Sequence, residues 1–233
     1  MTEAKVLITF DDGCPPHLQA AKLLTELGLV GTFSVVVGNM ETAGLSKPSI
    51  DEMAAMGHFV CNHSWSHPQP TVDSDKITED AVRAKRWLME RGFHGDYYIS
   101  PFGGKTIHGH HHLQQLLKEF KWIRTVNGVV TETGYQFKEE MIYSQPFMPD
   151  MRVVPSTAPG SIGNPDRVKL SVDLAILRKE LSVLMYHGVA SKSPKGWDIS
   201  WEMFVRQMAY VSRRVEDKSI ACLTPEELLR RNE

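Results

Sequence analysis

Short apolar runs alternate with segments of helical periodicity along most of this chain, and this alternation limits the folds open to it. A short β-branched apolar run predicts a buried strand, whereas apolar residues three and four apart predict a helix. Strands that alternate with helices in this way usually form a parallel sheet. The 233 residues, 42% of them hydrophobic, suffice for one sizeable core. We therefore predict an α/β fold in a single domain spanning residues 1–233.

The expected strands are short and apolar, and they lie at residues 5–9, 31–37, 58–62, 96–100, 122–126, 182–187 and 219–223. The expected helices lie at residues 15–28, 49–57, 78–92, 113–120, 165–180 and 200–215, and from 224 onward. Ser49 and Glu52 match a capping box, and Thr78 is the expected start of the third helix. Residues 127–164 are rich in Gly, Pro, Thr and Met and predict only short strands.

Ionisable side chains follow three of the expected strands. Asp11 and Asp12 come directly after the first strand, His63 and His67 follow the third, and His187 ends the run "LMYH". The carboxyl ends of parallel strands meet at one face of such a fold, where the chemistry usually lies. We expect these five side chains to converge there.

The spacing of His63 and His67 suits a metal site. Histidines four apart can present both imidazoles to one ion, and Pro68 favours a short turn over a long helix at this point. Two imidazoles and a carboxylate suit Zn²⁺ or a similar first-row ion, with one position left for water. One aspartate can bind the ion while the other accepts a proton from that water. The alternative is that both histidines are polar loop residues.

Three motifs together resemble those of a known family. "TFDDG" at residues 9–13, "HSWSH" at 63–67 and "LMYH" at 184–187 are similar, in order and spacing, to the motifs of the polysaccharide deacetylases. These are the family 4 carbohydrate esterases with the nodulation-type deacetylase homology domain. The resemblance extends over residues 6–229 and implies a distorted (β/α) barrel of seven or eight strands.

The resemblance also implies a role for each motif residue. Asp12, His63 and His67 would bind a divalent metal, with zinc expected and cobalt, nickel or manganese as alternatives. Asp11 would be the general base, and His187 would be the general acid that protonates the leaving amine.

The segment "SPFGG" resembles the third motif of the family, which implies an oxyanion-binding and substrate-binding role for Phe102 and Gly103. The family's arginine is missing from this motif, because Ile99 stands in its place. Arg124, at the end of a later strand, is the predicted catalytic substitute that orients Asp11. The alternative for Arg124 is an ordinary surface position.

Several other side chains have two interpretations. Trp65 and Trp201 are candidate substrate contacts, as is Trp197, and each of the three can instead pack in the core. The histidine-rich run at residues 108–112 is expected to be a solvated loop, and the alternatives are adventitious metal binding or part of a lid over the strand ends.

The predicted activity is a metal-dependent amide hydrolase that removes an N-acetyl group from an amino sugar in an oligosaccharide or polysaccharide. The metal would polarise the carbonyl, while a base and a separate acid would move the protons. The main alternative keeps the metal site but hydrolyses small cyclic amides or ureides, as imidases and allantoinases do. A carbohydrate-binding protein without catalysis is a third hypothesis, which the base and acid candidates argue against.

Charge and composition exclude other classes. With 26 basic and 28 acidic residues, the chain has no basic excess for nucleic acid. No apolar stretch approaches the ~20 residues that cross a bilayer. Three scattered cysteines and an N-terminus without a signal segment predict a cytoplasmic protein. The expected partner is a small-molecule or oligosaccharide substrate, and the oligomeric state is left open.

Overall fold

The computed structural model describes residues 3–40, 42–104, 109–126, 128–131, 134–137, 143–146, 151–159, 166–190 and 197–230. Its strands are β1 (Lys5–Phe10), β2 (Thr32–Val35), β3 (Phe59–Asn62), β4 (His94–Ile99), β5 (Trp122–Thr125), β6 (Gly128–Thr131), β7 (Gly134–Phe137), β8 (Val153–Pro155), β9 (Ala158–Pro159), β10 (Leu181–Tyr186), β11 (Val189–Ala190), β12 (Ile199–Ser200) and β13 (Ala221–Cys222). Its helices are α1 (His17–Glu26), α2 (Lys47–Ala55), α3 (Ser74–Met89), α4 (Gly109–Glu119), α5 (Asp166–Arg178), α6 (Trp201–Glu216) and α7 (Pro225–Arg230).

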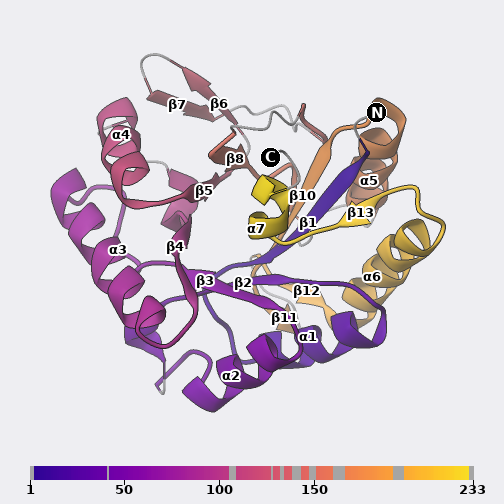
Figure 1. Cartoon of the computed structure of the whole chain (residues 1–233), viewed down its shortest axis with the longest axis horizontal. Helices are drawn as coiled ribbons and strands as arrows, with labels where there is room; N and C mark the ends of the chain where they lie inside the picture. The colour runs from indigo at the N-terminus through magenta and orange to yellow at the C-terminus, as the bar shows by residue number, and fades with distance from the viewer. Residues whose placement is uncertain are drawn as a thin grey trace.

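The main sheet is wholly parallel. Its strands follow the order β8-β5-β4-β3-β2-β1-β10-β9, and β13 pairs with the beginning of β1. Helices α1 to α6 surround the sheet on the outside (Figure 1). The neighbouring strands β1 and β10 are buried along their whole length. This burial on both faces explains why they are almost continuous apolar runs.

One extended segment joins the two edges of the sheet. Residues 153–155 pair with β5, and residues 158–159 pair with β10. Between them, the Ser156 N–H donates to the Thr125 carbonyl at 2.8 Å and the Thr157 N–H donates to the Val183 carbonyl at 2.9 Å. With β8 and β9 taken as one strand, seven strands curl into a distorted barrel. The predicted α/β class and barrel architecture are confirmed.

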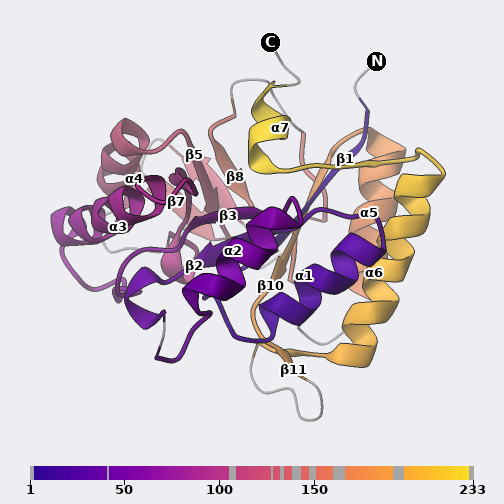
Figure 2. The same cartoon turned by 60° about the horizontal axis from the view of Figure 1, so that its bottom comes forward.

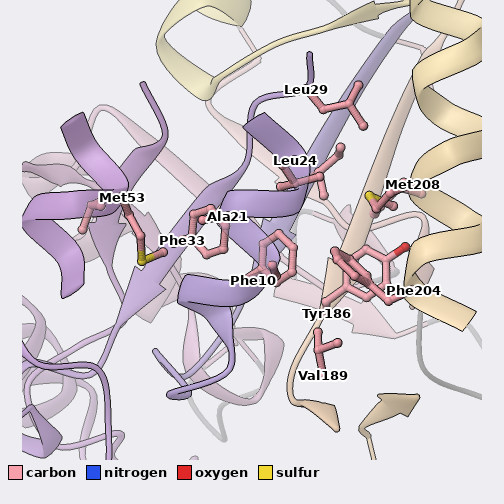
Figure 3. Packing of buried hydrophobic residues seen from close by; sticks show 14 of the residues in the cluster. Phe10, Ala21, Leu24, Leu29, Phe33, Met53, Tyr186, Val189, Phe204 and Met208 are labelled. Carbon is pink, nitrogen blue, oxygen red and sulfur yellow. The ribbon is translucent and has the colours of Figure 1, made fainter. Parts of the chain in front are cut away.

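An aromatic cluster includes the last residues of β1 and β10 (Figure 3). Phe10 of β1 stacks on Phe33 of β2 with ring centroids 4.4 Å apart, and it lies 5.4 Å from the ring of Tyr186 in β10. Phe204 of α6 meets Tyr186 edge-on at 5.3 Å. Burying each such ring stabilises the fold by about 1.5–3 kcal/mol. Phe10 directly precedes Asp11 and Tyr186 directly precedes His187. The packing of the two rings therefore fixes where Asp11 and His187 leave the sheet.

The strand ends and the chain termini lie on opposite sides of the molecule. Both termini and α7 lie at one end, whereas β11, which follows β10, lies at the other (Figure 2). Leu228 of α7 is fully buried in a cluster with Leu7 and Leu181, so α7 covers the end where the strands begin. The end where the strands finish is therefore the one that carries the predicted site.

Three helices, α2, α3 and α4, begin earlier than predicted. The cap of α2 is Ser46, whose hydroxyl accepts from the Ser49 N–H at 3.3 Å, so Ser49 lies inside the helix. The cap of α3 is Asp73, and the helix is already formed at Thr78. The predicted starts of α2 and α3 are wrong because serine and threonine also fit inside a helix, and only the hydrogen bonds to the backbone identify the cap. Helix α4 begins at Gly109 rather than at residue 113, so residues 109–112 begin a helix instead of the expected solvated loop, and His112 is buried. His108 and nearly half of residues 127–164 lie outside the described residues.

Candidate active site

The aspartate pair diverges as the chain leaves β1. The Asp11 N–H still donates to the Tyr186 carbonyl at 2.8 Å, which continues the sheet by one residue. Asp12 then has φ 72° and Gly13 has φ 65°, both left-handed. For a non-glycine residue this conformation costs about 1–2 kcal/mol. The turn leaves the Asp11 side chain buried and the Asp12 side chain 36% exposed.

Asp12, His63 and His67 form a cluster suited to a metal. One ligand atom from each lies within 4.8 Å of the other two. The Asp12 Oδ1 atom is 3.2 Å from His63 Nε2 and 3.3 Å from His67 Nε2. Burial raises the pKa of the Asp12 carboxyl, but hydrogen bonds from both imidazoles outweigh it and lower the pKa well below its usual range. Asp12 is therefore a carboxylate throughout the neutral range.

The tautomer of His63 also suits metal binding. Its Nδ1 atom lies 2.7 Å from the Ile99 carbonyl oxygen, which can only accept a hydrogen bond. When the ring is neutral, as a metal ligand must be, Nδ1 carries the proton and Nε2 has a lone pair for an ion in place of its hydrogen bond to Asp12. A backbone carbonyl behind the imidazole is the usual arrangement at metal sites. Within the described residues, a carboxylate and two imidazoles thus present the donor set that zinc prefers.

Arg124 is buried and contacts Asp11. Its guanidinium Nη2 donates to Asp11 Oδ1, and Nη1 lies 3.1 Å from the sulfur of Met185. Arg124 of β5 is the register partner of Ile99 of β4. The register thus sets Arg124 next to Ile99, the position at which the family motif was expected to have its arginine. Arg124 is fully buried, which rules out the surface alternative.

The charges around Asp11 keep it ionised. Burial raises the pKa of its carboxyl, but the Arg124 guanidinium outweighs this, with help from His187 and His63, and the net pKa is lowered. The His187 Nε2 atom lies 3.9 Å from Asp11 Oδ2, which is close enough for an attractive interaction when His187 is protonated. The predicted base and acid candidates are therefore neighbours.

His17 of α1 contacts the main chain of His187. Nothing in the sequence pattern indicated this role for His17. Its Nε2 atom lies 2.7 Å from the His187 carbonyl oxygen, so Nε2 donates and carries the proton. The ring is fully buried against Phe10 and Phe33, and burial lowers the pKa of His17 to about 4. A neutral histidine thus holds the main chain of the candidate acid.

The third motif forms a tight left-handed turn beside the metal cluster. Phe102 has φ 51° and Gly103 has φ 68°. A Cβ on residue 103 would lie 2.2 Å from Val126 Cγ1, so only glycine fits. The Gly103 N–H donates to the Ser100 carbonyl at 3.0 Å and is thus engaged within the turn. The Phe102 ring is 39% exposed and lies 4.7 Å from the ring of His67.

The tryptophans divide into packing and exposed residues. Arg83 covers one face of Trp65 at 3.6 Å, and Trp65 packs against the core. Trp201 also packs against the core, with its ring 5.9 Å from Phe204. These contacts favour the packing interpretation for both. Trp197 is 54% exposed and its ring lies 5.8 Å from that of His187.

Comparison with known proteins identifies the family of this chain. The family model described as polysaccharide deacetylase matches residues 1–122, which is more than half of the chain. The chain belongs to the polysaccharide deacetylase family. The matched part contains the first two motifs, and it ends before Arg124 and His187.

A curated polysaccharide deacetylase relative is the chitooligosaccharide deacetylase of Rhizobium leguminosarum bv. trifolii, which is 33% identical over 81 residues. These residues make up 34% of this chain and 36% of the relative. The match therefore spans only about a third of that protein. The family and this relative support a deacetylase and do not favour the cyclic-amide alternative.

Solved structures of polysaccharide deacetylases share the fold over nearly the whole chain. The peptidoglycan N-acetylglucosamine deacetylase Bc1960 matches with a TM-score of 0.62 at 17% identity, covering 98% of this chain and 89% of that one. The family 4 carbohydrate esterase of Streptomyces lividans, solved with acetate, matches with a TM-score of 0.58 at 15% identity, covering 96% and 94%. At these identities the likeness concerns the fold.

None of the helices among the described residues has the length and apolar character needed to cross a membrane.

Proposed function

We propose that this chain is a metal-dependent deacetylase that releases acetate from an N-acetylated amino sugar, with oligosaccharides as the preferred substrates. The observation that carries the proposal is the juxtaposition of the Asp12–His63–His67 cluster with Asp11, which is itself paired to Arg124. A carbohydrate-binding protein would need neither a buried base nor an acid beside it. The family match supports the same activity.

Asp12, His63 and His67 are the proposed metal ligands. A divalent ion held by these residues, with zinc expected, would supply polarisation of the acetamide carbonyl and a lower pKa for the attacking water. Asp11 accepts the proton of the attacking water. Arg124 keeps the Asp11 carboxyl ionised and turned toward the cluster, as the lowered pKa of Asp11 supports.

His187 is the proposed general acid. Protonated His187 donates to the amide nitrogen as the C–N bond breaks, so the products are acetate and a free amine. Its place beside Asp11, 3.9 Å away, suits a proton that arrives at one residue and leaves from the other. The N–H of Phe102 is the proposed donor to the oxyanion, because the N–H of Gly103 is already engaged.

Trp197 and Phe102 are the proposed contacts for the sugar rings. They are the two strongly exposed aromatic side chains of the described residues, and each lies against a site histidine. Exposed rings beside polar side chains suit the apolar faces of sugars. They support a substrate with rings on both sides of the reacting group, hence an oligosaccharide.

Acetate release tests this function. Metal-stripped protein is reconstituted with zinc, cobalt, nickel or manganese and given N-acetylglucosamine oligomers, with Asp51→Asn on α2 as a matched surface control. We expect metal-dependent acetate that Asp11→Asn abolishes and His187→Gln lowers by about 10²–10⁴-fold. Metal-loaded, folded protein that releases no acetate from any oligomer would refute the proposal, and ring opening of small imides would then be measured.

A further inference from the structure

A carboxylate from another element holds the turn that carries both site histidines. Asp80 lies on α3, and its Oδ1 atom accepts from the Trp65 N–H at 2.8 Å and from the Ser66 N–H at 3.1 Å. Its Oδ2 atom accepts from the Ser66 hydroxyl at 2.7 Å. Three hydrogen bonds to one ionised side chain are among the stronger polar contacts available. They engage the two residues at the centre of the His63-to-His67 turn.

Asn62 holds the same turn from the strand side. Its Oδ1 atom accepts from the Ser64 N–H at 2.7 Å, while its Nδ2 donates to the carbonyls of Ala81 and Gly95 at 2.9 and 3.1 Å. The Ser64 hydroxyl then accepts from the His67 N–H at 2.8 Å. Asn62 and Asp80 thus tie the turn to β3, β4 and α3.

The backbone of the turn requires such support. Ser64 has φ 73° and His67 has φ 54°, so two non-glycine residues are left-handed within four positions. This conformation is unfavourable for both residues and persists only where the surroundings enforce it. It nevertheless aligns the two imidazoles, whose ring centroids are 5.1 Å apart. A relaxed turn would separate the two Nε2 atoms that face Asp12.

We propose that Asp80 is a positioning residue that preforms the metal-binding turn, so that His63 and His67 are aligned before any metal binds. This inference rests on the metal site of the proposed function. Asp80 touches neither the ion nor the substrate, and it acts through the amides of Trp65 and Ser66. Residues that orient metal ligands in this way typically change metal affinity by about 10–100-fold when they are replaced.

The first test is zinc affinity, measured by competition with a chromophoric chelator on the full chain. We expect Asp80→Ala to weaken zinc binding by about 10–100-fold. Asp80→Asn keeps an oxygen that can accept both backbone N–H groups, so we expect most of the affinity to be retained. The matched control is Glu79→Ala, an exposed carboxylate next to Asp80 on the same helix, which should leave zinc affinity unchanged.

The second test needs neither metal nor activity. In metal-stripped wild-type protein, the Trp65 and Ser66 amides should be protected from hydrogen exchange, and Asp80→Ala should remove that protection while Glu79→Ala retains it. If Asp80→Ala does not fold, Ser66→Ala removes only the contact to Oδ2 and should weaken zinc binding by a smaller factor.

The outcomes divide cleanly. Unprotected Trp65 and Ser66 amides in metal-free wild-type protein would overturn preformation, as would Asp80→Ala protein that binds zinc within about twofold of wild type. If exchange and zinc affinity change as expected but no acetate is released, the role of Asp80 stands and the proposed activity fails. If acetate is released while Asp80→Ala leaves amide exchange and zinc affinity unchanged, the proposed activity stands and the role of Asp80 fails.

Discussion

Arg124 donates a hydrogen bond to the carboxylate of Asp11 across 113 residues of sequence, and both side chains are buried. The contact exists because β4 and β5 pair in a register that sets Arg124 beside Ile99. A buried carboxylate without a partner is strongly destabilising, whereas one paired to a guanidinium is tolerated. The pair therefore links the stability of the barrel to the ionisation of the proposed base.

Replacing Arg124 should damage stability and activity together. Arg124→Met leaves Asp11 buried without its cation, and we expect the free energy of unfolding to fall by about 3–5 kcal/mol. Acetate release should fall by at least about tenfold, because the pKa of Asp11 rises and its orientation is lost. Urea unfolding of the metal-free protein and an acetate assay of the zinc-loaded protein measure the two effects.

A double variant separates the two effects. Arg124→Met with Asp11→Asn removes both charges and should recover much of the lost stability, while activity stays absent. The surface pair Lys22–Glu52, with side chains about half exposed, is the control, and Lys22→Met should cost less than about 1 kcal/mol. Full activity in Arg124→Met would show that Asp11 needs no arginine.

Loss of one proposed ligand should abolish tight metal binding. His63→Ala or Asp12→Ala leaves two of three donors, and we expect zinc affinity to fall by more than about 100-fold, because each lost donor costs more than an outer contact. Equilibrium dialysis with metal analysis measures the zinc affinity. The control is His94→Phe, at the beginning of β4 and away from the strand ends that carry the site. Tight zinc that persists in both ligand variants would locate the metal elsewhere, the histidine run at 108–112 being the first place to search.

Trp197 should affect substrate binding more than turnover. Its ring stands beside His187 on the proposed leaving-group side, so Trp197→Ala should raise KM for N-acetylglucosamine oligomers by about tenfold, the equivalent of about 1.4 kcal/mol. Its kcat should change much less. Trp87→Ala, on the outer helix α3, is the matched control. Unchanged KM for every oligomer tested would exclude Trp197 from the sugar site.

His17 predicts a loss of stability in mild acid. Burial lowers the pKa of His17 in the folded state from 6.5 to about 4. Between these pH values His17 is therefore protonated in the unfolded chain and neutral in the folded chain. Stability is therefore complete above about pH 6.5 and declines as the pH falls toward about 4, by about 3 kcal/mol at about 1.4 kcal/mol per pH unit.

The comparison variant is His17→Gln, whose side-chain amide can still donate to the His187 carbonyl. Urea unfolding of metal-free protein at several pH values should give a smaller acid loss for His17→Gln than for wild type. His58 and His94, whose pKa values burial also lowers, contribute equally to both proteins and cancel. Parallel stability curves for the two proteins would contradict a buried neutral His17.

Much of the fold and part of the site follow from local pattern. The apolar runs of β1 and β10 and the helical spacing of α6 are visible in the sequence, because buried strands and amphipathic helices each have their own period. Asp12, His63 and His67 were predictable as a cluster, because polar residues directly after parallel strands meet at one face. The choice of caps for α2 and α3 was not, since the local pattern fits several neighbouring residues.

Only the tertiary structure decided the supporting residues. Arg124 was one of two interpretations until the register of β4 and β5 set it beside Asp11. His17 and Asp80 have no motif, because a helix residue meets a loop according to how the helix packs on the sheet. The sequence by itself determined which side chains leave the strand ends. Their partners were decided by register and packing, since both depend on residues far apart in the chain.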